Sequence, residues 1–141
     1  MHIHLFRVIV PVSDVDYAAK FYSHLLGQPG VRVSSGRHYF DCGGTILACF
    51  DSQVEDHRPS TPNPEHIYFS VDDLETVFAR AKIAGCTKLD EEIKTRPWIE
   101  RSFYATDPFG NRICFVDAAT KFTGTPEQMA EMTRRFAAFR T

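Results

Sequence analysis

No apolar run in the 141-residue sequence approaches the ~18 residues that a membrane-spanning helix needs. Neither sign of charge dominates, because 16 Lys and Arg residues stand against 18 Asp and Glu residues, and the formal net charge is −2. That balance argues against non-specific nucleic-acid binding, which needs a basic surface. The first residues also lack the basic and apolar regions of a signal peptide. We therefore expect a cytoplasmic protein that binds neither membranes nor nucleic acid.

The four cysteines show no C-x-x-C motif and no paired zinc spacing. In a reducing compartment we expect free, mostly buried thiols at Cys42, Cys49, Cys86 and Cys114. Apolar residues make up 43% of the chain and charged residues 24%, which is the composition of an ordinary globular protein. A chain of this length can form a core without disulfides or structural metals.

What the sequence does contain is an internal repeat of about 60 residues. Each copy reads as a strand, a helix that ends at a glycine, and three further strands, and a proline-rich linker over 52–64 separates the copies. The second helix begins at Asp72, with Glu75 as the partner of a capping box. The predicted strands span 5–12, 31–35, 37–42 and 45–51 in the first copy, and 66–71, 88–93, 101–105 and 111–117 in the second.

The two copies align without gaps at both ends. Val12-Ser13-Asp14 matches Val71-Asp72-Asp73, which places Arg7 opposite His66, and the stretch 44–51 matches 110–117, which places Ala48 opposite Cys114. The pattern predicts an α+β fold of two βαβββ modules with curved mixed sheets enclosing a cavity, plus a C-terminal helix. The expected units are a first module and linker at 1–59, a second module at 60–118 and a helical tail at 119–141.

Alternation along the strands assigns the two faces of each sheet, because successive side chains of a strand point to opposite sides. One side is apolar throughout and is expected to pack against the helices. The other side carries charged, aromatic and titratable groups, which indicates that it lines a cavity. Its members include Arg7, Ile9, Ala48, Phe50, His66, Tyr68, Arg112 and Cys114.

These paired modules resemble the vicinal oxygen chelate superfamily, which includes glyoxalase I, extradiol dioxygenases, and fosfomycin and bleomycin resistance proteins. The resemblance covers about residues 5–118. It is carried by Val12-Ser13-Asp14, Phe21-Tyr22 and Leu26-Gly27 in the first copy, and by the stretches 66–73, 101–104 and 107–113 in the second. The resemblance implies a homodimer, with modules paired within or across chains. It also implies metal ligands at the start of each first strand and near the end of each fourth strand.

In this sequence those four positions hold Arg7, Ala48, His66 and Cys114, of which only His66 is a ligand type that the resemblance implies. Arginine repels a cation and alanine has no donor, so we expect no metal and no other cofactor. His38 or His4 could in principle join His66 and Cys114 to rebuild a site.

The candidate ligand-binding set is the cavity side of the strands together with a loop tryptophan and a neighbouring arginine near the mouth. Arg7 either pairs with a carboxylate such as Asp41 or grips an anionic ligand bidentately. His66 either packs as a hydrogen-bonded imidazole inside the cavity, or it contacts the ligand as a donor or acts as a general base. The set comprises Arg7, Ala48, Phe50, His66, Tyr68, Trp98, Arg101 and Cys114, with Cys114 expected to be an inert thiol.

Two functions remain open at this point. The first is a glyoxalase- or bleomycin-resistance-like protein that binds a small, anionic or aromatic molecule without a metal. The second is a metal-dependent lyase, isomerase or dioxygenase with a rearranged metal site. Whether the protein catalyses a reaction is left undecided by the sequence, because one fold supports many functions.

Beyond residue 120 the resemblance ends. Thr125 followed by Pro126 and Gln128 predicts a capped helix start. The helix carries one apolar stripe, which is expected to pack on its own chain or on a partner subunit. The stripe consists of Met129, Met132, Phe136 and Phe139.

Overall fold

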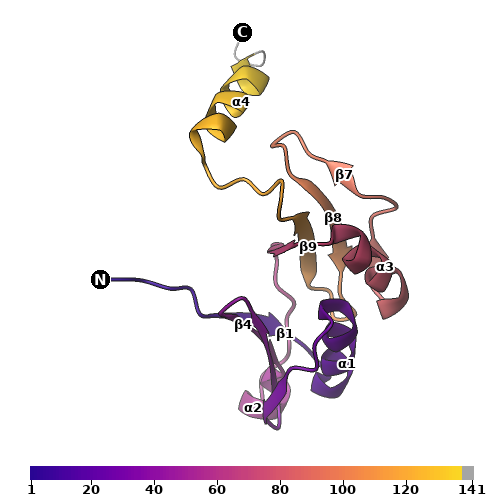
Figure 1. The fold of residues 1–141 in the computed structure, drawn as a ribbon. Coiled ribbons are helices and arrows are strands. Elements are labelled where there is room, and N and C mark those ends of the chain that lie inside the picture. The colour runs from indigo at the N-terminus through magenta and orange to yellow at the C-terminus, as the bar shows by residue number, and fades with distance from the viewer. Residues whose placement is uncertain (138–141) are drawn as a thin grey trace.

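The computed structural model describes residues 1–137, which form two successive modules and a projecting C-terminal helix (Figure 1). The first module contains β1 (Arg7–Pro11), α1 (Val15–Leu26), β2 (Val31–Ser34), β3 (Arg37–Cys42) and β4 (Thr45–Phe50). A short helix, α2 (Ser52–Asp56), follows. The second module contains β5 (Ile67–Val71), α3 (Leu74–Ala84), β6 (Lys88–Leu89), β7 (Lys94–Thr95), β8 (Arg101–Thr106) and β9 (Arg112–Asp117), and α4 (Pro126–Ala137) ends the described chain.

Each module forms its own mixed sheet, which confirms the predicted α+β class. The first sheet has the strand order β1-β4-β3-β2, and the second has the order β5-β9-β8-β6 with β7 also paired to β8. In both sheets the first strand runs parallel to the last strand of its module, and the other pairs are antiparallel. Both sheets are open, with β1 and β5 at their edges.

Of the predicted strand over 88–93 only Lys88–Leu89 forms, as β6, and a second short strand, β7, follows at Lys94–Thr95. The physical reason lies at Asp90, whose backbone N–H still donates to Tyr104 O, at 3.0 Å. Its carboxylate accepts from Tyr104 N at 2.9 Å and from the Arg96 guanidinium at 2.8 Å. These side-chain bonds replace ladder bonds, so the chain leaves the sheet after Leu89 and returns at Lys94.

The main helix of each module, α1 or α3, begins after a capping aspartate and ends at a left-handed glycine. Asp14 accepts a hydrogen bond from Tyr17 N, and Gly27 ends α1 with φ of 70°. In α3 the cap is Asp73, which accepts from Thr76 N. The expected capping box of Asp72 and Glu75 is therefore not formed. The Glu75 carboxylate is instead ion-paired with Arg101.

The two helices lie side by side against the sheets and share one core (Figure 1). Its largest fully buried side chains come from both modules, so neither module has a separate core of its own. They include Tyr22, Phe40, Phe103, Phe115, Leu25, Leu74 and Ile113.

A buried polar network at the β8–β9 turn ties the second module to the first. The Tyr22 hydroxyl donates to Asp107 Oδ2 at 2.6 Å, and Asn111 Nδ2 donates both to Asp107 Oδ2 at 2.9 Å and to Pro11 O at 2.6 Å. Asp107 Oδ1 accepts from the backbone N–H groups of Phe109 and Asn111, each at 2.8 Å. Asp107 and Asn111 are fully buried, so the bonds that join them to each other and to Tyr22 lie away from water.

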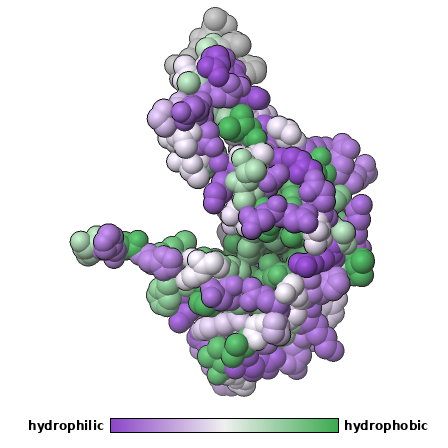
Figure 2. Space-filling view, viewed as in Figure 1, coloured by the Kyte–Doolittle hydropathy of each residue, from purple (hydrophilic) through white to green (hydrophobic). Residues whose placement is uncertain are grey.

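Two segments project from this body. The N-terminal arm over 1–6 leaves Ile3 and Leu5 exposed, and α4 has no buried residue (Figure 2). The predicted cap of α4 is confirmed, because Thr125 Oγ1 accepts from Gln128 N and Gln128 Oε1 accepts from Thr125 N. Of the predicted apolar stripe, Phe139 lies outside the described residues. Within residues 1–137 no helix is long and apolar enough to cross a membrane.

Candidate functional site

Each sheet has one face packed on the helices and one face turned away from them, which we call the open face. Register pairs on the first open face are Ile9 with Ala48 and Ala48 with Tyr39. Arg7 lies two residues before Ile9 on the same face of β1, opposite Ile46. Its guanidinium carbon lies 5.2 Å from the centre of the Tyr39 ring. The expected face assignment therefore holds for Arg7 and Ala48.

Arg7 is supported by aromatic rings and not by a carboxylate. Its guanidinium also lies 5.0 Å from the centre of the Phe6 ring. No carboxylate within residues 1–137 lies within ion-pair distance of it. Asp41, the partner considered from sequence, instead accepts from Gly44 N at 2.8 Å. The positive charge of Arg7 is thus exposed beside aromatic faces without a counterion from the described chain.

The other arginine on this face is already engaged. Arg37 donates to Glu55 Oε1 at 3.0 Å and to the Tyr39 hydroxyl at 3.1 Å. Its guanidinium carbon lies 4.5 Å from the centre of the Phe50 ring. Phe50, which was expected in the site, therefore lies under Arg37 on the same face as Arg7.

The second open face holds an aromatic cluster around Cys114. Tyr68 and Tyr104 flank Cys114 in the register, and their hydroxyl oxygens lie 3.4 Å apart. The His66 ring precedes β5 and makes an edge contact with the Tyr104 ring, with 4.7 Å between centroids. The structure thus brings His66, Tyr68 and Cys114 together, as expected, and adds Tyr104, which the predicted set did not include.

Burial keeps the Cys114 thiol protonated. The side chain is fully buried, and desolvation raises its pKa to about 11 although hydrogen bonds to Ser102 and Tyr104 act in the opposite direction. Burial and the hydroxyl of Tyr68 likewise raise the pKa of Tyr104. Neither group is a thiolate or phenolate near neutral pH, so the cluster offers neutral donors and not an activated nucleophile.

Arg96 supports this cluster from the side, and no local sequence pattern predicts this role. Its guanidinium donates to Ser102 Oγ at 3.0 Å and to Asp90 Oδ2 at 2.8 Å, and its guanidinium carbon lies 4.7 Å from the centre of the Tyr104 ring. Only the pairing of β7 with β8 brings Arg96 to this position. Because its charge is balanced by Asp90, Arg96 fixes Tyr104 and is not a free cation.

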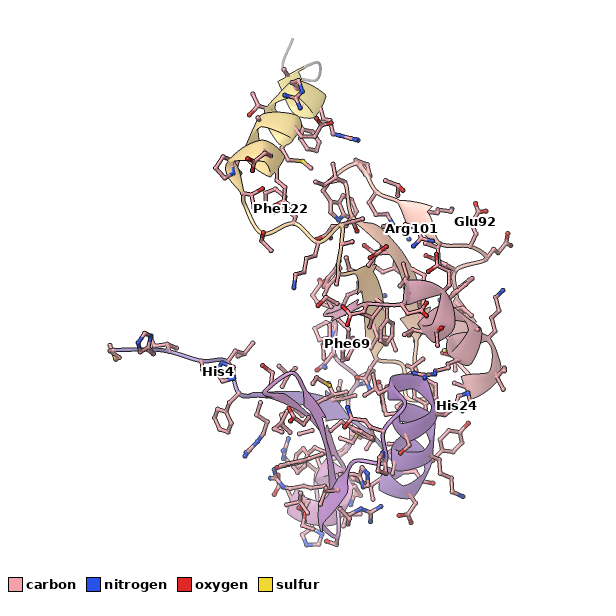
Figure 3. All side chains as sticks on the ribbon, in the orientation of Figure 1. His4, His24, Phe69, Glu92, Arg101 and Phe122 are labelled. Carbon is pink, nitrogen blue, oxygen red and sulfur yellow. The ribbon has the colours of Figure 1, made fainter. Side chains whose placement is uncertain are left out.

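Trp98 and Arg101, expected near the cavity mouth, lie in different places. Trp98 is partly exposed, lines a groove of about 420 Å³ together with Tyr68, and donates from Nε1 to Glu100 at 2.8 Å. Arg101 instead lies on the helix-covered face, where it pairs with Asp117 at 3.2 Å and with Glu75 of α3 (Figure 3). Arg101 alternates with Ser102 along β8, and Ser102 belongs to the open face.

A hollow of about 600 Å³ lies between the modules. Figure 2 shows apolar surface gathered in this hollow between the two halves of the molecule. Leu5 and Ile46 line it from the first module, and Ile67, Tyr68 and Phe69 line it from the second. Arg7, Ala48 and Cys114 do not line it, so within one described chain the two halves of the predicted site lie on separate sheets.

The donors at the family ligand positions do not form a metal site. Arg7 and Ala48 supply no ligand, and Cys114 is a buried thiol whose pKa is raised. His38 and His4 are also engaged elsewhere: their Nε2 atoms lie 2.9 Å from Pro29 O and 3.1 Å from Gly44 O. In the part of the chain that the structure describes, no three His, Cys, Asp or Glu side chains are grouped so as to hold a metal ion. The residues present do not fit the metal that the resemblance implies.

Comparison with known proteins agrees with this architecture. The sequence profile of the Glyoxalase/Bleomycin resistance protein/Dioxygenase superfamily matches residues 4–115. The glyoxylase-like protein CFP32 of Mycobacterium bovis is 30% identical over 101 residues, which are 67% of this chain but 36% of CFP32, so the chain spans about a third of that relative's length. The metallothiol transferase FosB of Shouchella clausii is 28% identical over 102 residues, covering 71% of this chain and 70% of FosB.

Solved structures show the same fold. A glyoxalase/bleomycin resistance protein from Albidiferax ferrireducens superposes with a TM-score of 0.68 at 25% identity, covering 79% of this chain and 95% of that protein. A bleomycin resistance determinant encoded on the transposon Tn5 superposes with a TM-score of 0.63 at 18% identity, covering 82% and 98%. The paired modules, the matching profile and these superpositions show that the chain belongs to the glyoxalase/bleomycin resistance protein/dioxygenase superfamily, which is the vicinal oxygen chelate superfamily.

Proposed function

We propose that this protein binds a small anionic molecule with a planar or aromatic part, without a metal ion. The observation that carries the proposal is Arg7, an exposed guanidinium that stands at a family ligand position. It rests against the rings of Phe6 and Tyr39 and has no counterion within residues 1–137. A carboxylate or phosphate can accept two parallel hydrogen bonds from such a guanidinium.

The surroundings of Arg7 suit an aromatic ligand. Ala48, on the strand next to β1, is a small and uncharged residue at a position where the resemblance implies a metal ligand. Tyr39 offers a ring face beside the guanidinium, at 5.2 Å. The ligand's anionic group would be fixed by Arg7, and its planar part would be buried against aromatic side chains.

We further propose that the complete site forms in a homodimer. Arg7 belongs to the first sheet, whereas His66, Tyr68 and Cys114 belong to the second, and the two sets do not meet within one described chain. The edge strands β1 and β5 are both open, and apolar side chains such as Ile9 and Leu5 are exposed beside β1. A second copy that pairs with these edges would bring one set of residues to the other. Light scattering at micromolar concentration tests this, and a monomeric mass would contradict it.

The function is tested by ligand titration followed through the fluorescence of Trp98, the only tryptophan of the chain. Phenylacetate and its neutral counterpart phenylacetamide are the probes, and Arg7→Ala is the variant. Loss of a charge-assisted hydrogen bond costs about 1.5–3 kcal/mol, so Arg7→Ala is expected to weaken phenylacetate binding roughly 10- to 100-fold. Binding of phenylacetamide is expected to change little.

Arg58→Ala is the control, because it removes another exposed guanidinium, which follows α2 and is already paired with Asp56 at 2.9 Å. If the wild-type protein binds the amide as well as the carboxylate, and Arg7→Ala alters neither, then Arg7 has a structural role and the anion proposal is wrong.

A further inference from the structure

A row of polar and cationic side chains crosses the second open face at one end. Lys88 on β6 is opposite Thr106 on β8, and Thr106 is opposite Arg112 on β9. His66 continues the row, because it directly precedes Ile67, which is opposite Ile113. These four side chains line one cavity of about 320 Å³ together with Asp90 and Tyr104.

The two cations of this row have no counterion within residues 1–137. In the described part of the chain no ion pair or side-chain hydrogen bond engages Lys88 or Arg112, whereas Arg37 and Arg96 on the open faces are each bound to a carboxylate. The only acid that lines the cavity, Asp90, is already held by Arg96 at 2.8 Å and by Tyr104 N at 2.9 Å. The cavity therefore has an excess of positive charge that the described chain does not neutralise.

The first module shows that the fold does not require this row. In the first sheet the equivalent row consists of Arg7, Ile46 and Asp41, because Ile46 matches Arg112 in the repeat and is opposite both Arg7 and Asp41. That row carries one cation and one acid, whereas the row of the second sheet carries two cations and no acid. The excess of positive charge belongs to the second module, so it calls for a reason other than folding.

The spacing of the row suits one compact oxyanion. Neighbouring strands lie about 4.8 Å apart, so the backbones of Lys88 and Arg112 are roughly 10 Å apart with Thr106 between them. Both side chains are long enough to converge above the Thr106 hydroxyl from opposite sides. The His66 ring reaches across Cys114 as far as Tyr104, at 4.7 Å, which places an imidazole at the border of the same cavity.

We propose that Lys88, Thr106 and Arg112, with His66 at the border, bind the phosphate group of a small phosphorylated molecule. A terminal phosphate offers three acceptor oxygens, which match an ammonium, a guanidinium and a hydroxyl better than the two oxygens of a carboxylate. The next row along the strands consists of Tyr104, Cys114 and Tyr68, so an apolar or planar part of the same molecule would lie against those rings. This row shares His66 with the homodimeric site proposed above and lies beside its Tyr68 and Cys114, but it does not include Arg7 and does not depend on the anion binding proposed for Arg7.

Phenyl phosphate is the probe, and its binding is followed by shifts of the backbone amide resonances in two-dimensional NMR of the full chain. The amides of Lys88, Thr106 and Arg112 are expected to shift together along one binding curve. Arg112→Gln is expected to weaken binding at least tenfold, and Lys88→Gln/Arg112→Gln to abolish it. Phenylacetate is expected to bind at these amides at least tenfold more weakly than phenyl phosphate.

The charge-matched control is Lys82→Gln/Arg58→Gln, which removes the same net charge from α3 and from the segment after α2 and should change the dissociation constant less than twofold. Lys88 lies on a short edge strand, so the single variant Lys88→Gln provides a second readout if Arg112→Gln proves unstable. The proposal is overturned if the double variant binds phenyl phosphate like the wild-type protein. It is also overturned if the shifts gather at Arg7 and Tyr39, or if no amide shifts at millimolar phenyl phosphate. Arg7→Ala should leave these shifts unchanged, which separates this test from that of the proposed function.

Discussion

The bond between Tyr22 and Asp107 provides a direct test of how the two modules hold together. Tyr22 is fully buried in α1, and its hydroxyl donates at 2.6 Å to a buried carboxylate of the second module. Tyr22→Phe removes that donor and leaves the ring packing in place. Three other hydrogen bonds to Asp107 remain, so the carboxylate is not left without partners.

A hydrogen bond to a charged group contributes about 1.5–3 kcal/mol. For a chain of this size we expect the melting temperature of Tyr22→Phe to fall by roughly 5–12 °C. Differential scanning calorimetry measures both quantities. Tyr17→Phe is the matched control, since Tyr17 lies on the same helix, is half exposed and makes an edge contact with the Phe109 ring. Equal melting temperatures for the two variants would refute the view that this bond locks the modules.

The same bond has a signature at alkaline pH. Burial and the charge of Asp107 both raise the pKa of Tyr22 well above its ordinary value. A raised pKa stabilises the fold while the unfolded tyrosine is still protonated, and this contribution is lost as the pH rises above about 10. The stability difference between wild-type protein and Tyr22→Phe should therefore be constant from pH 6 to 9 and shrink above pH 10. A difference that grows above pH 10 would contradict the assigned cause.

Two further predictions concern the buried thiols and the β8–β9 turn. Burial raises the pKa of Cys114 to about 11, so iodoacetamide at pH 8 should leave Cys114 unmodified in the native protein and modify it after denaturation. Mass spectrometry of the peptides measures this labelling. Native labelling of Cys114 as fast as that of the partly exposed Cys42 would count against the prediction. Gly110→Ala should destabilise the protein by about 1–2 kcal/mol, because φ is +92° at Gly110 and the added Cβ would lie 3.3 Å from Pro62. An unchanged free energy of unfolding in urea would contradict this explanation of the turn.

Much of the fold follows from local sequence signals. The glycines at 27 and 85 end helices because each adopts a left-handed backbone, which is the one conformation that a glycine supplies at low cost. The repeat predicted two equivalent sheets, and alternation predicted their open faces. The prediction of a single strand over 88–93 was wrong, because the Asp90 carboxylate accepts hydrogen bonds from Tyr104 N and Arg96. Local propensity does not encode these bonds.

The site was harder to predict because it depends on strand register. The repeat alone predicts equivalent places for Arg7 and His66, because Arg7 begins β1 and His66 directly precedes β5, the equivalent strand. Lys88 and Thr106 become neighbours only through the pairing of β6 with β8, for which the sequence carries no local signal. Arg101 was misplaced relative to the open face because a shift of one residue along a strand reverses the side to which a side chain points.

We propose that the family's metal site has been replaced in this chain by a site that works without a metal. Elemental analysis of the purified protein, with His66→Ala beside the wild type, tests this most directly. The donor set of Arg7, Ala48, His66 and Cys114 predicts less than about 0.1 equivalent of nickel, zinc, manganese or iron per chain, unchanged in the variant. One equivalent of any of these metals in the wild-type protein, lost in His66→Ala, would contradict the account.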